Sequence, residues 1–139
     1  MITQTQCTRF KLNLLKGLED FSPTSPYVYK LALYTSQATL NAATTQYTTD
    51  NEVVGAGYVA GGKVLTPNTV SESGTTAYVS FDNVEWNPAS FTAGGGLIYN
   101  STTGAAVAVL SFGSDKVTTT TFPVTFPSAT ADTAILRIS

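Results

Sequence analysis

Residues 27–34, Tyr27-Val28-Tyr29-Lys30-Leu31-Ala32-Leu33-Tyr34, form a run of aromatic, branched and other apolar side chains that begins directly after Pro26. A second run, residues 105–112, is almost entirely apolar and lies between Gly104 and Gly113. Such runs, short and bounded by Pro or Gly, are typical of strands in the middle of a sheet. We therefore predict that these two segments are central strands.

Further segments with alternating or branched side chains lie on both sides of these runs. They are residues 63–72, 75–81, 84–86, 90–93, 97–100, 117–126 and 133–138. Pro67 predicts an edge or a bulge, whereas Gly94–Gly96 and Gly113–Lys116 predict separations between strands. About eight or nine strands at roughly 8–12-residue spacing, without helices between them, predict an all-β fold, an antiparallel β-sandwich. Residues 35–52 are predicted to be a long loop, with a helical turn near residues 38–43.

The first 26 residues differ from the rest of the chain. Phe10, Leu14, Leu15 and Leu18 recur at helical spacing, but an extended arm fits the same residues. We predict an N-terminal arm or short helix over residues 1–26, ended by Gly17 and a Pro-containing stretch, and a β-sandwich domain over residues 27–139. Residues 1–18 carry three basic side chains and no acid, whereas residues 19–139 carry nine acids and four basic side chains. Such a basic end is suited to an acidic partner.

Most of the residue types used in catalysis are scarce in this chain. It contains no His, one Cys and only 12% charged residues. Cys7 has no imidazole to activate it and no partner for an intrachain disulfide. We therefore predict no catalytic residue, no cofactor and no metal. The first residues lack the pattern of a signal peptide and no stretch is long enough to span a bilayer, so we expect assembly in a cytoplasm-like compartment.

Two groups of acids were weighed as sites. Asp82 and Glu85 are two carboxyls close to Trp86 in the sequence. Paired carboxyls beside an aromatic ring are suited to glycoside hydrolysis. Asp50-Asn51-Glu52 offers oxygen ligands of the kind calcium prefers, without the spacing of a calcium loop. A polar turn and a solvated acidic loop are the alternatives that we favour.

Six motifs follow one another along the chain: Tyr29–Ser36 (YKLALYTS), Tyr47–Val53 (YTTDNEV), Gly57–Gly62 (GYVAGG), Leu97–Ser101 (LIYNS), Val109–Gly113 (VLSFG) and Ala134–Ile138 (AILRI). In this order they resemble small structural proteins of tailed-phage virions, and the resemblance covers most of residues 8–138. Within that group the chain is most similar to capsid decoration, or cement, proteins. The resemblance implies a dimeric, jelly-roll-like sandwich bound to the outside of the major capsid shell, and it supplies no catalytic residues. In the run Gly94–Gly96, where the group leads us to expect a bulkier or charged residue, no contact is carried over.

We therefore expect a virion structural protein, assembled in the host cytoplasm, that binds the outer capsid surface and stabilises contacts between capsid subunits. Its expected partners are the major capsid protein and further copies of itself, as a dimer or higher oligomer. Neither nucleic acid nor membrane is expected, since three clustered cations are too few for phosphate binding. The alternative is a receptor- or carbohydrate-binding module of a tail fibre or baseplate, with Tyr side chains and Trp86 as platforms. The predicted contact residues are Arg9, Phe10, Lys11, Leu14, Leu15, Tyr47 and Trp86.

Overall fold

The larger of the sheets contains five strands in the order β1-β8-β7-β2-β3, each antiparallel to its neighbours. In this computed structural model, which describes residues 1–138, the strands are β1 (Thr5–Gln6), β8 (Ala106–Thr118), β7 (Phe91–Asn100), β2 (Tyr29–Tyr34) and β3 (Lys63–Val64). The two segments predicted as central strands are β2 and the first part of β8, and both lie inside the sheet. That prediction is confirmed.

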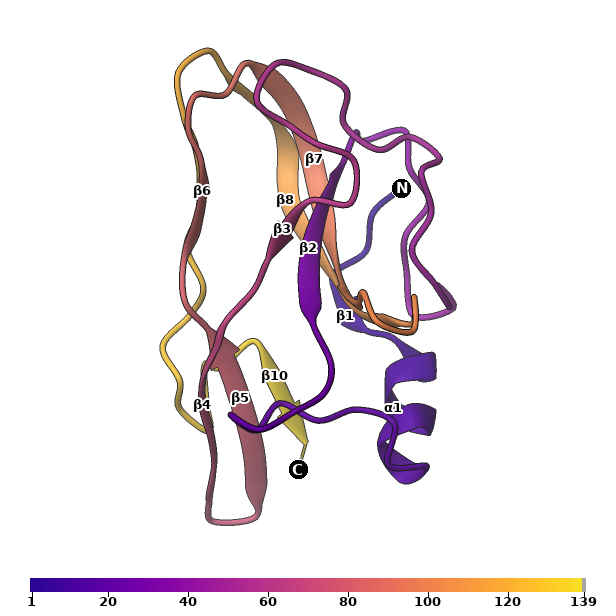
Figure 1. Cartoon of the computed structure of the whole chain (residues 1–139), viewed down its shortest axis with the longest axis vertical. Coiled ribbons are helices and arrows are strands. Elements are labelled where there is room, and N and C mark those ends of the chain that lie inside the picture. Colours follow the sequence, from indigo (N-terminus) through magenta and orange to yellow (C-terminus); the bar gives the residue numbers. More distant parts are fainter. Residues whose placement is uncertain (139) are drawn as a thin grey trace.

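Two smaller antiparallel ladders lie across from this sheet (Figure 1). One has the order β10-β5-β4 and the other pairs β6 with β9. Their bounds are β4 (Pro67–Ser73), β5 (Thr76–Phe81), β6 (Val84–Trp86), β9 (Phe122–Val124) and β10 (Leu136–Ile138). Aromatic rings fill the space between the layers: the ring centroids of Phe91 in β7 and Phe122 in β9 are 5.2 Å apart. The fold is therefore an all-β, sandwich-like arrangement of antiparallel sheets, as predicted.

The predicted break at Gly94–Gly96 is wrong, because β7 runs through all three glycines. A Cβ atom on Gly94 would lie 2.8 Å from the backbone N of Ser36, and one on Gly95 would lie 2.4 Å from the carbonyl O of Leu110. Neighbouring backbone therefore packs directly on this part of the strand, where only Gly fits. The pairing of β7 with β8 also shifts register between Ala93 and Gly95, which is a local bulge.

The predicted turn at residues 113–116 is also wrong, since β8 continues to Thr118. Gly113 has a φ of +82°, and the strand after it pairs with the first residues of β7, with Phe91 opposite Thr118. The tertiary pairing thus extends the strand beyond a local turn signal. The chain then re-enters the second layer at β9, where Phe122 and Val124 are buried, and Phe126 just after the strand is buried as well.

The strand pairing changes the predicted bounds of two strands and shows the structure of the long loop. The strand predicted at residues 63–72 is divided into β3 and β4, with an irregular register at Pro67, and β4 is the outer strand of its sheet. The last strand begins at Leu136 rather than at Thr133. The loop predicted at residues 35–52 contains turns and single bridges, and the helical turn near residues 38–43 does not form.

The N-terminal residues are part of the same body. Residues 8–15 form the helix α1 (Thr8–Leu15), the helical one of the two predicted alternatives, and β1 extends the five-stranded sheet. Cys7 and Phe10 belong to the hydrophobic core. Burial raises the pKa of the Cys7 thiol to about 11, as expected for an unreactive cysteine.

Candidate functional site

Helix α1 presents one side to the core and leaves the other exposed. Phe10 and Asn13 are buried and Leu14 is partly buried, which is the spacing of a single helical face. Lys11 and Leu15 point away from the core, and the Leu15 side chain is 89% exposed. The helix therefore carries an apolar side chain on its outer surface that is left almost fully exposed by residues 1–138.

The helix ends in a Schellman motif. Gly17 has a φ of +70°, its N–H donates to the carbonyl of Leu14 (3.1 Å), and the N–H of Leu18 donates to the carbonyl of Asn13 (2.8 Å). Gly17 thus ends the helix, as the sequence predicts, and it fixes the position of the last helical turn. Leu15 is held in that turn.

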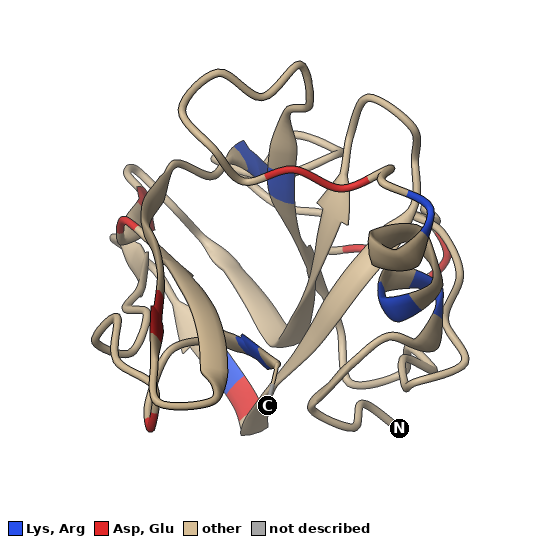
Figure 2. Ribbon diagram, turned by 90° about the horizontal axis from the view of Figure 1, so that it is seen from below, with Lys and Arg blue, Asp and Glu red and all other residues tan. Residues whose placement is uncertain are grey.

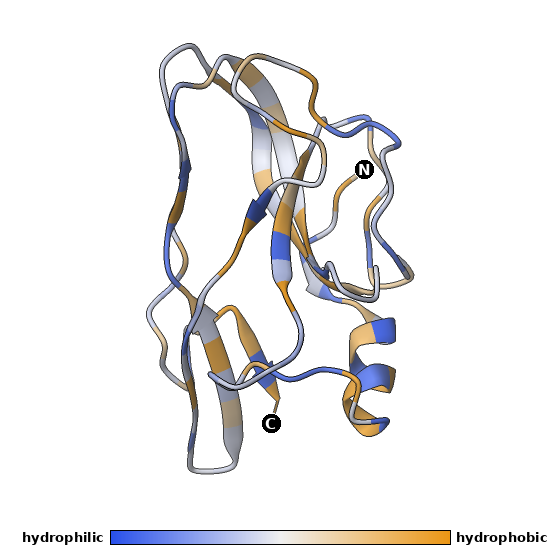
Figure 3. Cartoon of the chain, viewed as in Figure 1, coloured by the Kyte–Doolittle hydropathy of each residue, from blue (hydrophilic) through white to orange (hydrophobic). Residues whose placement is uncertain are grey.

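Two adjoining depressions lie between α1 and the strands β10 and β5. Their cavity volumes are about 440 and 150 Å³, and both are lined by Leu14 and Ile138. We call the two depressions together the α1–β10 groove. Its principal lining residues are Phe10, Lys11, Leu14, Leu15, Leu136, Arg137 and Ile138. Figure 3 shows apolar residues on both α1 and β10.

Basic side chains lie along the same groove. Lys11 from α1 and Arg137 from β10 line it, and no Asp or Glu is among its lining residues. Arg137 is held at both ends: its guanidinium Nη1 donates to the carbonyl of Asp132, and its own carbonyl accepts from Gln6 Nε2 (2.7 Å). Figure 2, which looks onto this end of the molecule, shows the basic residues of α1 and the basic residue of β10. The groove is therefore apolar along its floor and positively charged at its sides.

The structure places the seven predicted contact residues in different environments. Lys11, Leu14 and Leu15 come together in the groove, and Arg9 is exposed on the same helix. Phe10 is only 2% exposed, so it supports the groove from below rather than offering a free surface. Sequence reasoning missed Arg137 and Ile138, because their proximity to α1 depends on the tertiary arrangement and not on any local pattern.

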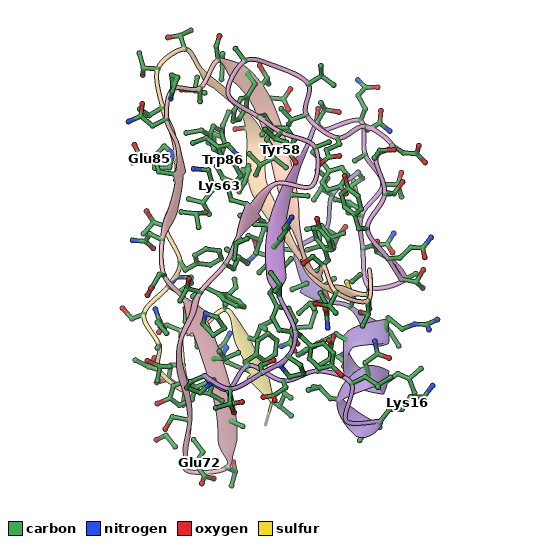
Figure 4. All side chains as sticks on the ribbon, in the orientation of Figure 1. Lys16, Tyr58, Lys63, Glu72, Glu85 and Trp86 are labelled. Atoms are coloured by element: carbon green, nitrogen blue, oxygen red, sulfur yellow. The ribbon has the colours of Figure 1, made fainter. Side chains whose placement is uncertain are left out.

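Trp86 cannot serve as the predicted exposed platform, since its side chain is 1% exposed. Tyr58 stacks on it with ring centroids 6.1 Å apart, and Lys63 Nζ lies 5.8 Å from the ring centroid. Figure 4 shows these three side chains together, with Glu85 beside them. Trp86 is a core residue. Its large ring buries the most apolar area when it packs between the sheet layers.

Tyr47 lies away from the groove, in a cluster around the buried carboxylate of Glu52. The hydroxyl groups of Tyr47 and Tyr58 donate to this carboxylate over 2.6 and 2.5 Å, and the N–H of Gly61 donates over 2.8 Å. Tyr99 stacks on Tyr47 and donates its hydroxyl to the carbonyl of Gly61. Of the three residues considered as calcium ligands, Glu52 therefore has both carboxylate oxygens engaged in hydrogen bonds, whereas Asp50 and Asn51 are exposed.

A second buried carboxylate, Glu19, lies just after α1. Its Oε1 accepts from Asn100 Nδ2 (2.8 Å) and from the Tyr29 hydroxyl (3.2 Å), whereas its buried Oε2 has no hydrogen-bond partner. Burial raises the pKa of Glu19, and its hydrogen bonds to Asn100 and Tyr29 oppose that rise. This carboxyl ties the end of the helical segment to β2 and β7.

The remaining acids form no enclosed site. Asp82 and Glu85 are both exposed, on either side of the start of β6. Among residues 1–138 there is no group of three or more His, Cys, Asp or Glu side chains placed to hold a metal ion. Over the same residues, no helix has the length and apolar character needed to cross a membrane.

Comparisons of the chain with protein families, with curated proteins and with solved structures found no match.

Proposed function

We propose that this chain is a virion structural protein of a tailed phage, which binds the outer surface of the major capsid protein and stabilises contacts between capsid subunits. The observation that carries this proposal is the α1–β10 groove, an apolar surface with basic sides on an otherwise inert β body. The motifs that resemble phage structural proteins lie mainly in β2, β7, β8 and β10. These motifs support the assignment to virion structural proteins. The groove supports the proposed surface of contact with the capsid.

Leu15 is the residue that we expect to contribute most to binding of the capsid. Covering an exposed Leu side chain contributes about 1.5–3 kcal/mol, and Leu15 is 89% exposed. Ile138, 51% exposed, faces the same groove. On a symmetric shell many copies bind side by side, so a modest contact per copy is sufficient for stable decoration.

A carbohydrate- or receptor-binding role in the tail has less support from the geometry. Trp86, the strongest candidate for a sugar platform, is buried, and Tyr47 is engaged by Glu52 and Tyr99. The capsid role is therefore the single function proposed.

The test uses purified shells that lack this protein and point variants rather than a truncation. Deleting the first 18 residues would remove Cys7 and Phe10 from the core, so loss of binding would only report unfolding. Leu15→Glu places a charge on the exposed side of α1 and should reduce occupancy of the shell about tenfold or more. Val117→Glu, at an exposed apolar position in β8, is the matched control and should bind normally.

A density map of the decorated particle locates the chain. Many copies spread over the shell, with α1 against the capsid, are the expected result. Copies confined to the tail, or no binding of the wild-type chain to any shell, would overturn the capsid role.

A further inference from the structure

We infer that the α1–β10 groove binds a short extended segment of the partner, in which apolar side chains stand next to carboxylates. The inference rests on the proposed function, because it names the kind of segment on the partner that the groove accepts.

The groove has the shape of a channel. A helix forms one side and the strand β10 forms the other, and Leu14 and Ile138 line both depressions. A concave channel of this kind accepts a single chain segment, whereas a membrane surface or a flat protein face would leave its floor unfilled.

Its apolar residues call for apolar side chains on the occupant. Leu15 and Ile138 are exposed at the sides, and below them lie the buried side chains of Phe10 and Leu136. The floor is thus rigidly packed, while the upper side chains are open to solvent. An occupant that brings Leu, Val or Ile side chains covers Leu15 and Ile138 without rearranging the core.

The charges call for carboxylates. Lys11 and Arg137 both line the groove, and no Asp or Glu among residues 1–138 lines it. Arg9 and Lys16 add positive charge on the outside of the same helical segment. Both cations attract a carboxylate that enters the groove, whereas two cations are too few to hold a nucleic-acid backbone.

The extended conformation of the occupant follows from the position of β10. It is an end strand of its sheet, paired with β5 on one side only. On its other side the side-chain amide of Gln6 donates to the carbonyl of Arg137, the kind of bond that the N–H of a neighbouring strand would make. A strand-like segment that lies along β10 replaces this side-chain bond with a backbone bond, as in other cases of strand addition.

Three fluorescently labelled synthetic peptides test this inference on the full-length chain. The first alternates Leu and Asp, the second alternates Leu and Lys, and the third alternates Ser and Asp. Fluorescence anisotropy should show that the Leu/Asp peptide binds at least about tenfold more tightly than either of the others, and that its binding weakens as salt is added.

Variants locate the binding to the groove. Lys11→Glu and Leu15→Ser should each weaken binding of the Leu/Asp peptide about tenfold, whereas Lys116→Glu, an exposed residue of β8, should leave it unchanged. Circular dichroism confirms that each variant is folded. Equal affinity for the three peptides, or unchanged binding by Lys11→Glu, would overturn the inference.

Three further outcomes separate this inference from the proposed function and from self-association. If the wild-type chain decorates shells and Lys11→Glu decorates them equally well, the capsid role stands and the acidic segment is ruled out. If the Leu/Asp peptide binds as expected but the chain binds no shell, the groove is correctly described and the capsid role fails. If sedimentation shows a dimer that Leu15→Ser dissociates, the occupant is a second copy and the inference is wrong.

Discussion

Replacing Glu52 by Gln should destabilise the fold strongly, although it changes only one atom. The Glu52 carboxylate is buried and accepts hydrogen bonds from Tyr47, Tyr58 and the backbone of Gly61. A Gln side chain has one acceptor oxygen, so its amide nitrogen must face at least one of these donors. A hydrogen bond to a charged group contributes about 1.5–3 kcal/mol, and a buried donor left unpaired adds to the cost. We expect the free energy of unfolding to fall by about 2–4 kcal/mol, out of the roughly 5–15 kcal/mol typical of a single domain.

The assay is urea unfolding followed by tryptophan fluorescence. Trp86 is the one tryptophan of the chain and is buried against Tyr58, so its emission reports on the core beside the Glu52 cluster. Glu72→Gln, at an exposed position of β4, is the matched control and should change the free energy by less than about 0.5 kcal/mol. If Glu52→Gln loses no more than the control, the carboxylate does not anchor the loop and the reasoning is refuted.

Three further predictions concern packing, pH and the thiol. Gly95→Ala should reduce the free energy of unfolding by about 3 kcal/mol, because the new methyl would lie 2.4 Å from the Leu110 carbonyl, whereas Gly74→Ala in an open turn should cost about 1 kcal/mol. The pKa of Glu19 is raised in the folded chain, so the wild type should be most stable, relative to Glu19→Gln, below about pH 4 and should lose this advantage as the pH rises through the folded pKa. Urea midpoints measured from pH 4 to pH 8 check this. Cys7, whose pKa is raised to about 11, should react with a disulfide reagent at pH 8 at least about 100-fold more slowly in the folded chain than in urea.

Each of these predictions has a result that contradicts it. Equal losses for Gly95→Ala and Gly74→Ala would mean that β7 tolerates a side chain at its centre. A wild type and a Glu19→Gln variant with parallel pH profiles would show that desolvation of this carboxyl has no effect on stability. Rapid labelling of Cys7 in the folded chain would place the thiol at the surface.

The central strands were predictable because their side chains carry the information locally. β2 and the first part of β8 are apolar enough to be recognised as buried on both faces, and the alternation of Phe122, Val124 and Phe126 identifies a buried face. The glycines of β7 and Gly113 of β8 were misread as separations, because turn signals are local and the pairing of two long strands overrides them.

The candidate site was predictable in part for the same reason. Helical spacing and the surrounding basic residues point to Lys11, Leu14 and Leu15. The opposite side of the groove, with Arg137 and Ile138, lies more than 100 residues away in the sequence, so only the fold brings it near α1. Trp86 was placed at a contact surface because aromatic residues favour interfaces, but the need to fill the core between two sheet layers decides its position.

The pairing of β1 with β8 has a consequence for how the protein is made. Thr5 lies opposite Val109 and Gln6 opposite Ala108, so β1 can pair with β8 only after about a hundred further residues have been synthesised. Contacts this distant along the chain make folding slow compared with a helical bundle. Until that pairing forms, β1 contributes no hydrogen bonds to the sheet, so its docking is a long-range step of folding.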